Sequence, residues 1–214
     1  MKKLTFIATY RVLFALLGLA AVITQFTNST RLLGDAFHPD NFFSFFTIES
    51  NLLFIGVLFV GSYMAWRRKT SQTFEVFRGG AMIYMLITGI IFSLFLTGLE
   101  EELLTHVPWV NSTLHYILPV VAVLDWIIDV PKKQISFKKG LWWLAFPVAY
   151  LVYTLIRGSY VAWYPYPFLN PTLDGGWNRV ISMAIFITFV FVFVVWLTTR
   201  STALQKMPKK KAKR

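Results

Sequence analysis

Six long apolar segments divide this chain, and they constrain its fold more than any other feature. They cover residues 4–27, 42–66, 80–99, 109–130, 140–157 and 178–199. A helix that crosses a membrane needs about 20 mostly apolar residues, and a backbone in lipid must satisfy its own hydrogen bonds. The sequence therefore predicts an all-α membrane protein with six transmembrane helices. Residues 1–200 form one domain in this prediction, followed by a basic tail at 201–214.

Charge predicts how these helices are oriented. Basic residues lie before the first span and after the second, fourth and sixth: Lys2, Lys3, Arg67, Arg68, Lys69, Arg78, Lys132, Lys133, Lys138, Lys139, Arg200, Lys206, Lys209, Lys210, Lys211, Lys213 and Arg214. The opposite gaps contain Asp35, Asp40, Glu100, Glu101, Glu102 and Asp174. Because cytoplasmic loops are enriched in Lys and Arg, we expect the N and C termini to be cytoplasmic, in a multi-pass protein of the cell membrane.

The net charge of +11 does not indicate a nucleic-acid partner. A basic tail beside a membrane contacts anionic lipid headgroups, and that is the partner we expect for it. The chain has no cysteine, so it lacks disulfides and thiolate metal ligands. No group of His, Asp and Glu has metal-ligand spacing, and His38 and His106 fall in predicted outer loops. We therefore expect neither a metal nor a cofactor.

Polar residues inside the spans are the candidates for chemistry, because such residues are costly in lipid. Thr47 lies six residues inside the second span and His115 six residues inside the fourth. At 1.5 Å per residue, both are expected about 9 Å below the outer boundary. A hydroxyl and an imidazole at one depth suit a nucleophile and its general base. A structural hydrogen bond between helices is the alternative explanation for each residue.

Three further residues are candidates for an oxyanion-binding or orienting role. Asn51 shares a helix face with Thr47, and Asn111 shares one with His115. Glu49 points about 200° away from Thr47, and a buried carboxylate there needs a cation, a donor or a proton. A structural pair between Arg11 and Glu49 is one way to meet that need.

Other polar and irregular features have structural explanations. Asp125 lies about 15 Å deeper than His115, so we expect it near the inner helix end, together with Asp129. Pro119 and Pro147 fall inside spans and predict kinks. The aromatic segment at 160–171 is either part of an interfacial aromatic belt or a lid over the outer mouth of the bundle.

Three stretches of this sequence resemble a known family. They are Phe45-Phe46-Thr47-Ile48-Glu49-Ser50-Asn51-Leu52, Trp109-Val110-Asn111-Ser112-Thr113-Leu114-His115-Tyr116-Ile117-Leu118-Pro119 and Tyr166-Pro167-Phe168-Leu169. In order and placement they are similar to the signature stretches of the androgen-induced-gene and androgen-dependent TFPI-regulating proteins. The resemblance implies a six-helix intramembrane threonine hydrolase of fatty acid esters of hydroxy fatty acids, with Thr47 and His115 as its essential pair. The tail and Ser50-Asn51 are typical of a prokaryotic member, in an inner membrane.

The sequence thus favours a hydrolase of lipid esters with a Thr47 nucleophile and a His115 general base. Two alternatives without covalent chemistry remain. One is a transporter, which also has polar residues and kinked helices in the membrane, and the other is a lipid-binding scaffold. The substrate and the oligomeric state are not predicted.

Overall fold

The computed structural model describes residues 2–99 and 105–204, and within these ranges it contains helices and no strand. Six helical spans are long and apolar enough to cross a membrane. The α-helices are α1 (Lys2–Leu33), α2 (Pro39–Phe43), α3 (Phe46–Trp66), α4 (Gln72–Ile91), α5 (Pro108–Ser112), α6 (Leu118–Ile128), α7 (Phe137–Gly140), α8 (Ala145–Val161) and α9 (Gly176–Leu204). The fourth span joins α5 to α6, and the fifth joins α7 to α8. The six predicted spans are therefore confirmed as helices.

Two predicted boundaries are wrong in ways that matter for function. The predicted second span divides into α2 and α3, so Thr47 is the second residue of a helix. The third span begins at Gln72, where the Ser71 hydroxyl caps the helix by accepting from the Phe74 N–H. Arg78 therefore lies inside α4 and not in the preceding loop. Glu100, Glu101, Glu102 and most of the predicted tail, 205–214, lie outside the described residues.

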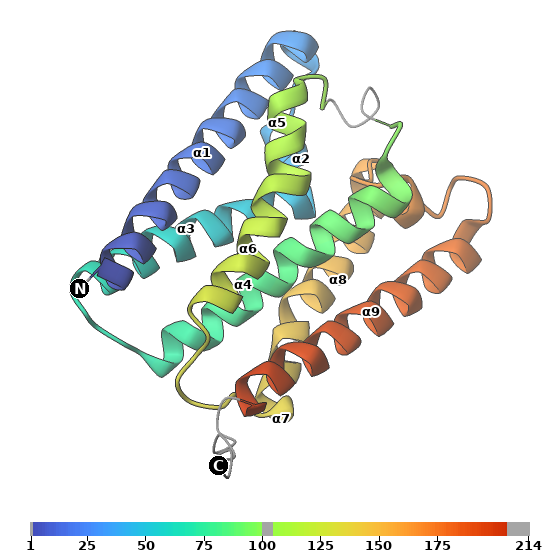
Figure 1. The fold of residues 1–214 in the computed structure, drawn as a ribbon. Helices are drawn as coiled ribbons and strands as arrows, with labels where there is room; N and C mark the ends of the chain where they lie inside the picture. The colour runs from blue at the N-terminus through green and yellow to red at the C-terminus, as the bar shows by residue number, and fades with distance from the viewer. Residues whose placement is uncertain (1, 100–104, 205–214) are drawn as a thin grey trace.

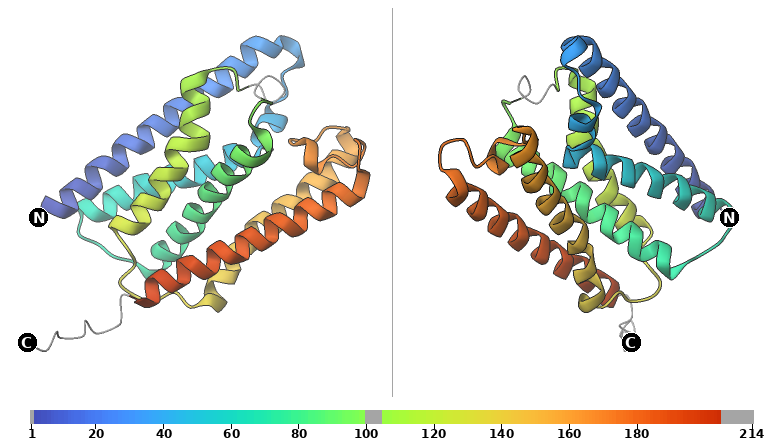
Figure 2. Two further views of the ribbon diagram at one scale, coloured as in Figure 1. Left: turned by 45° about the vertical axis from the view of Figure 1, so that its right-hand side comes forward. Right: turned by 180° about the vertical axis from the view of Figure 1, so that it is seen from behind.

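Helix α4 forms the centre of the bundle (Figure 1). It packs against α3 and α6 on one side and against α9 on the other. In its most apolar stretch 67% of the residues are buried, against 22% in the fifth and sixth spans. Two further views show that α1 and α3 converge near the N-terminus and spread apart toward their other ends (Figure 2). We call the end of the bundle where α1 and α3 converge the tight end.

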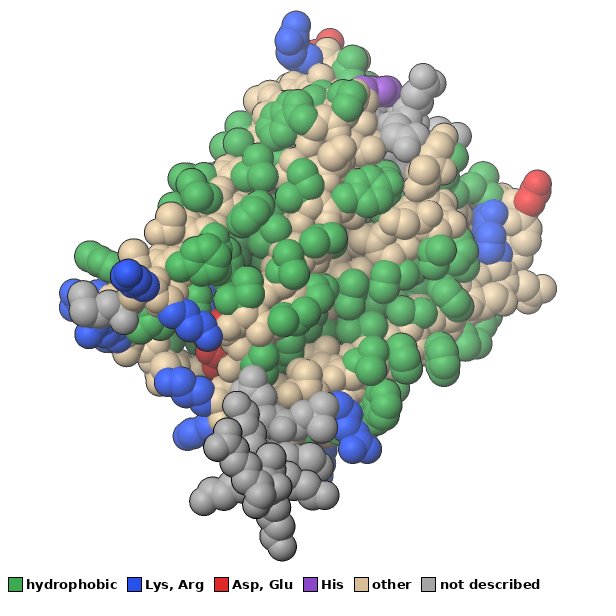
Figure 3. Space-filling view, viewed as in Figure 1, with side chains coloured by type: hydrophobic (Ala, Val, Ile, Leu, Met, Phe, Trp, Pro, Cys, Tyr) green, Lys and Arg blue, Asp and Glu red, His purple; other side chains and the backbone are tan. Residues whose placement is uncertain are grey.

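Charged and apolar side chains occupy different parts of the surface (Figure 3). Lys and Arg side chains gather around the tight end, where α1 begins and α9 ends, so we also call it the basic end. A band of hydrophobic side chains covers the face between this end and the opposite, far end. Large apolar side chains such as Leu13 and Phe189 point outward, with 61% and 70% of their surface exposed. An apolar outer surface on helices of this length suits a lipid environment.

The two prolines coincide with changes of helix type. A π-helical turn at Thr113–Ile117 ends just before Pro119, and a 3-10 turn at Leu141–Leu144 ends shortly before Pro147. Proline lacks the N–H that an α-helix uses to bond the carbonyl four residues earlier. The helical hydrogen-bond pattern therefore changes near both prolines. The kinks that the sequence predicts there stay a prediction.

A buried ion cluster joins the helices at the tight end. Asp125 of α6 accepts from Arg11 Nε at 2.6 Å and from Arg78 Nη1 at 2.7 Å, and its carboxylate is 1% exposed. The Tyr10 hydroxyl donates to the same carboxylate at 2.6 Å. Arg11 also binds Asp129, at 2.9 Å.

The cluster corrects one prediction. Arg11 pairs with Asp125 and Asp129, so the suggested pair with Glu49 is wrong. Asp125 lies near the end of α6, as predicted, and meets two arginines from within the spans. One of them, Arg78, also binds Glu75 at 2.6 Å. The cluster thus links α1, α4 and α6 through charges that are paired inside the bundle.

Replacing the central carboxylate should destabilise the protein strongly. In Asp125→Asn the two guanidinium groups stay buried without their shared anion, and breaking a buried pair costs about 3–5 kcal/mol. We expect a lower midpoint of thermal unfolding for this variant in detergent. Asp174→Asn is the matched control, because Asp174 is exposed. Equal midpoints for the two variants would contradict a stabilising role for the cluster.

Candidate functional site

Thr47 is the second residue of α3, which follows a two-residue interruption of the helical structure. Ser44 and Phe45 form this interruption between α2 and α3. A helix start leaves its first N–H groups without partners inside the helix. Phe45, at the capping position, has no side-chain acceptor to offer. The Thr47 N–H is therefore bonded from elsewhere in the molecule.

The partner of this N–H is Tyr166, from the loop between α8 and α9. The Thr47 N–H donates to the Tyr166 hydroxyl oxygen at 3.2 Å, and the Thr47 Oγ1 lies 3.4 Å from the same oxygen. Burial raises the pKa of Tyr166 to about 12. The phenol therefore keeps its proton at ordinary pH and remains a donor beside the Thr47 hydroxyl. The sequence did not identify Tyr166 as a site residue, although it belongs to the third signature stretch.

His115 lies on the π-helical turn of the fourth span. Its Nδ1 is 3.1 Å from the backbone oxygen of Asn111, and its ring stacks on Phe92 with centroids 3.8 Å apart. A carbonyl oxygen can only accept, so the geometry favours a hydrogen on Nδ1 and leaves the lone pair on Nε2. Single π turns inside α-helices are frequent at functional sites.

Asn51 connects the helices that carry Thr47 and His115. Its side-chain nitrogen donates to the Thr47 carbonyl at 2.8 Å and to the Leu114 carbonyl at 3.2 Å. Because one amide group reaches both, Thr47 and the residue before His115 lie at the same level of the bundle. Asn51 thus holds α3 and the π turn side by side, and both of these hydrogen bonds are donated by its side-chain nitrogen.

A cavity of about 150 Å³ with both polar and apolar lining lies at the far end, and we call it the polar cavity because most of the polar candidates lie on it. It is lined by residues from α1, α2, α3, α5, the π turn and the loop before α9. Thr47 and His115 both line it, together with Gln25, Asn41, Asn111 and Trp163. The sequence-predicted pair therefore faces one cavity.

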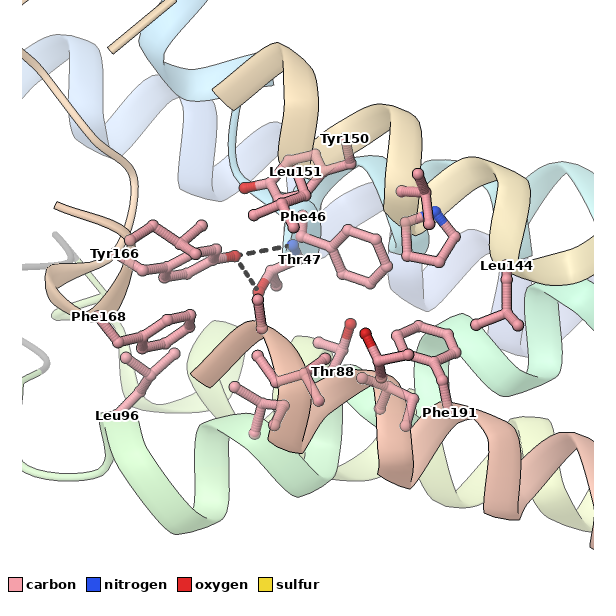
Figure 4. A pocket seen from close by; sticks show the side chains of 18 residues that line it. Phe46, Thr47, Thr88, Leu96, Leu144, Tyr150, Leu151, Tyr166, Phe168 and Phe191 are labelled. Atoms are coloured by element: carbon pink, nitrogen blue, oxygen red, sulfur yellow. Dashed lines mark hydrogen bonds between the residues drawn. The ribbon is translucent and has the colours of Figure 1, made fainter. Parts of the chain in front are cut away.

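A second, apolar cavity of about 100 Å³ lies between α3, α4, α8 and α9. Figure 4 shows Thr47 and Tyr166 hydrogen-bonded beside it, with Phe168 and Leu96 near Tyr166 and with Leu144 and Phe191 farther along. The lining includes Val148, which is 54% exposed on the outer face of α8. Part of the cavity wall therefore also belongs to the apolar outer surface of the bundle.

Three residues line both cavities: Thr47, Leu96 and Tyr166. The Thr47 hydroxyl group thus lies where an apolar space meets a polar one. Glu49, the remaining predicted candidate, is half-buried, lines neither cavity and forms no ion pair with a described residue. The site contains no group of three His, Asp or Glu residues among the described residues that could hold a metal ion.

The aromatic loop has an exposed first part and a buried second part. Tyr160 is 85% exposed at the end of α8. Tyr166 and Leu169 are buried over the cavities. Gly158 makes this packing possible, because a Cβ atom there would lie 2.1 Å from the Tyr164 ring. The second half of the loop therefore covers the site.

Comparisons with known proteins identify no relative: no protein-family model, no curated protein and no solved structure matches this chain. The site is therefore interpreted from its own geometry.

The packing of α4 against the π turn can be tested with a single methyl group. A Cβ atom on Gly89 would lie 3.0 Å from Pro119 Cβ and 3.2 Å from the His115 carbonyl oxygen. Both neighbours are rigid, so we expect Gly89→Ala to cost about 1–3 kcal/mol through overpacking. Gly56→Ala is the control, because nothing lies within 4 Å of its Cβ position. Thermal unfolding in detergent measures both, and equal stability of the variants would show that this contact is not tight.

Proposed function

We propose that this protein is an intramembrane hydrolase of lipid esters. One observation carries the proposal: Thr47 lines both an apolar cavity and a polar cavity, and His115 lines the polar one. A lipid ester has an apolar acyl chain on one side of its carbonyl carbon and an alcohol on the other. If the acyl chain occupies the apolar cavity and the alcohol part occupies the polar one, the carbonyl carbon lies beside Thr47, which lines both cavities.

The first half of the reaction transfers the acyl group to the protein. Thr47 Oγ1 attacks the ester carbonyl carbon while its proton moves to His115 Nε2. The tetrahedral intermediate collapses, and the leaving alcohol oxygen takes the proton from His115. The hydrogen bond from Nδ1 to the Asn111 carbonyl keeps the imidazole in the tautomer that this step requires.

Water completes the reaction from the polar cavity. Its oxygen attacks the acyl-threonine while His115 accepts one of its protons. The Thr47 oxygen then leaves and takes that proton back, and a fatty acid is released. Each proton that His115 accepts is returned, so the protein ends the cycle unchanged.

Two groups favour the negative charge that forms on the carbonyl oxygen. The positive end of the α3 dipole lies at Thr47, the second residue of that helix. The protonated Tyr166 hydroxyl lies 3.4 Å from Thr47 Oγ1 and can donate to the oxyanion. Donors of this kind typically contribute about 10²–10³ in rate. Asn51 donates to two carbonyls, so we assign it an orienting role rather than this one.

The resemblance to the androgen-induced-gene and androgen-dependent TFPI-regulating proteins supports the same proposal. All three resembling stretches contribute to the lining of the polar cavity, and Thr47, His115 and Tyr166 are among the residues they supply. Fatty acid esters of hydroxy fatty acids are the substrate class that the resemblance implies.

Loss of either member of the pair should abolish hydrolysis. We expect Thr47→Ala and His115→Ala each to lower turnover of long-chain esters by about 10²–10⁴-fold or more. The two losses should not add in the double variant, because a nucleophile and its base act as one unit. Thr47→Ser should retain part of the activity, since it keeps the hydroxyl. Purified protein in nanodiscs is the material for the assay.

Thr30→Ala and His106→Ala are the matched controls, because both side chains are exposed. Turnover that survives in Thr47→Ala and His115→Ala would place the chemistry elsewhere. A folded wild-type protein without turnover on any ester would favour a transporter or a lipid-binding scaffold.

We also propose that the basic end faces the cytoplasm, with both termini there, in a membrane of the prokaryotic inner-membrane type. The proposal is supported by the Lys and Arg side chains around that end. Because the chain has no cysteine, single cysteines report their side cleanly. A membrane-impermeant thiol reagent added to intact cells should label Asp174→Cys and not Lys138→Cys. The reverse pattern would overturn the orientation.

A further inference from the structure

The polar cavity contains a feature that the reaction scheme does not use. Asn111 lines this cavity, and its side-chain oxygen is buried without a hydrogen-bond partner among the described residues. An acceptor in this state costs free energy unless a donor reaches it. A ligand that fills the cavity therefore gains affinity if it brings a hydroxyl hydrogen to Asn111. A carboxylate has no hydrogen to donate.

The charge of the cavity lining also favours an uncharged hydroxyl compound over a carboxylate. Among the described residues that line the polar cavity there is no Asp, Glu, Lys or Arg. Arg157 contacts two lining residues from outside, donating to Asn41 Oδ1 at 2.6 Å and lying over the Trp163 ring. It also pairs with Asp40 at 3.3 Å. The basic side chains in the lining are the imidazoles of His38 and His115. A bound carboxylate would lose hydration without meeting a Lys or Arg there, whereas an uncharged alcohol has no charge to desolvate.

The volume of the polar cavity limits how large the bound ligand is. A cavity of about 150 Å³ accommodates a ligand of about the size of benzene. Glycerol, with three carbons and three oxygens, has as many heavy atoms as benzene. The aromatic residues Trp163 and Tyr164 also line the cavity, so its wall offers apolar contacts to the C–H groups of such a polyol as well as polar ones.

We propose that the polar cavity binds the alcohol part of the substrate, and that this part is an uncharged polyol of about the size of glycerol. The substrate class is then a fatty acyl ester of glycerol, with its acyl chain in the apolar cavity. The assignment rests on the proposed hydrolase function, but the binding of the polyol can be measured without turnover.

The test compares esters that differ only in the alcohol. Three palmitate esters serve as probes: the 1-glyceryl ester, the n-propyl ester with the same three carbons and no hydroxyl, and an ester of a hydroxy fatty acid with a free carboxylate. We expect kcat/KM for the glyceryl ester to exceed that for the propyl ester at least about tenfold, as one or two additional hydrogen bonds provide. Asn111→Leu should shrink this ratio, and the matched variant Asn178→Leu, on the exposed face of α9, should preserve it.

Two outcomes overturn the assignment. Equal kcat/KM for the glyceryl and propyl esters would remove the polyol site and leave the hydrolase intact. Preferred turnover of the carboxylate ester, lost in Arg157→Gln, would show that Arg157 turns inward to bind an acid.

Binding separates this assignment from the hydrolase proposal. 1-O-hexadecylglycerol cannot be hydrolysed, and hexadecyl propyl ether is its matched control. Tighter binding of the glycerol ether to nanodisc-embedded protein, weakened in Asn111→Leu, would support the polyol site even in a protein without turnover. Equal binding of the two ethers would refute the site whatever the enzyme does.

Discussion

A buried carboxylate inside an apolar bundle needs fixed partners, and Asp125 is the point on which the arrangement of this bundle depends. An unpaired charge in such surroundings costs far more than most single contacts contribute. Asp125 receives Arg11 from α1 and Arg78 from α4. Guanidinium groups bind carboxylates with strict geometry, so these pairs fix both the height and the rotation of the helices. Arg11 also donates to the Gly61 carbonyl of α3 at 3.3 Å, which adds a fourth helix.

Helices that are tied at one end can separate at the other. The spread of α1 from α3 leads toward the far end (Figure 2), and there α2 and the polar cavity lie between them. The break before α3 and the π turn lie at this end, and both leave backbone groups without regular helical partners. Irregular backbone at membrane depth is tolerated where it is buried in protein or lines a cavity. Tyr150 shows how this is done, because its hydroxyl donates to the Ser44 carbonyl in the break at 3.0 Å.

The sequence predicted the spans because apolar length is a local property. It also predicted that Thr47 and His115 lie at one level. The helix boundaries used for that prediction were wrong, but Asn51 donates to both the Thr47 and the Leu114 carbonyls, so the two segments do lie side by side. The sequence could not predict that Arg78 is buried inside α4. A charged residue next to an apolar segment indicates a loop, and only tertiary packing places Asp125 beside it as a partner. The role of Tyr166 depends on a break at Phe45 that hydropathy does not mark. The rigid run Tyr164-Pro165-Tyr166-Pro167 was the available signal, because a proline-flanked aromatic loop is too constrained for a simple connector.

An ester hydrolase within a membrane must bring water and an acyl chain to one atom without mixing them. In a soluble enzyme the acyl chain has to leave water for the protein, whereas in the proposed hydrolase the chain starts in lipid and water is the scarce reactant. A nucleophile then belongs near the end of a span, under a cover that limits how much water enters. Tyr166 suits that place in two ways, because it is buried and lines both cavities beside Thr47, and its hydroxyl accepts from the Thr47 N–H in the first turn of α3. One residue thus covers Thr47 and also holds the helix start on which Thr47 lies.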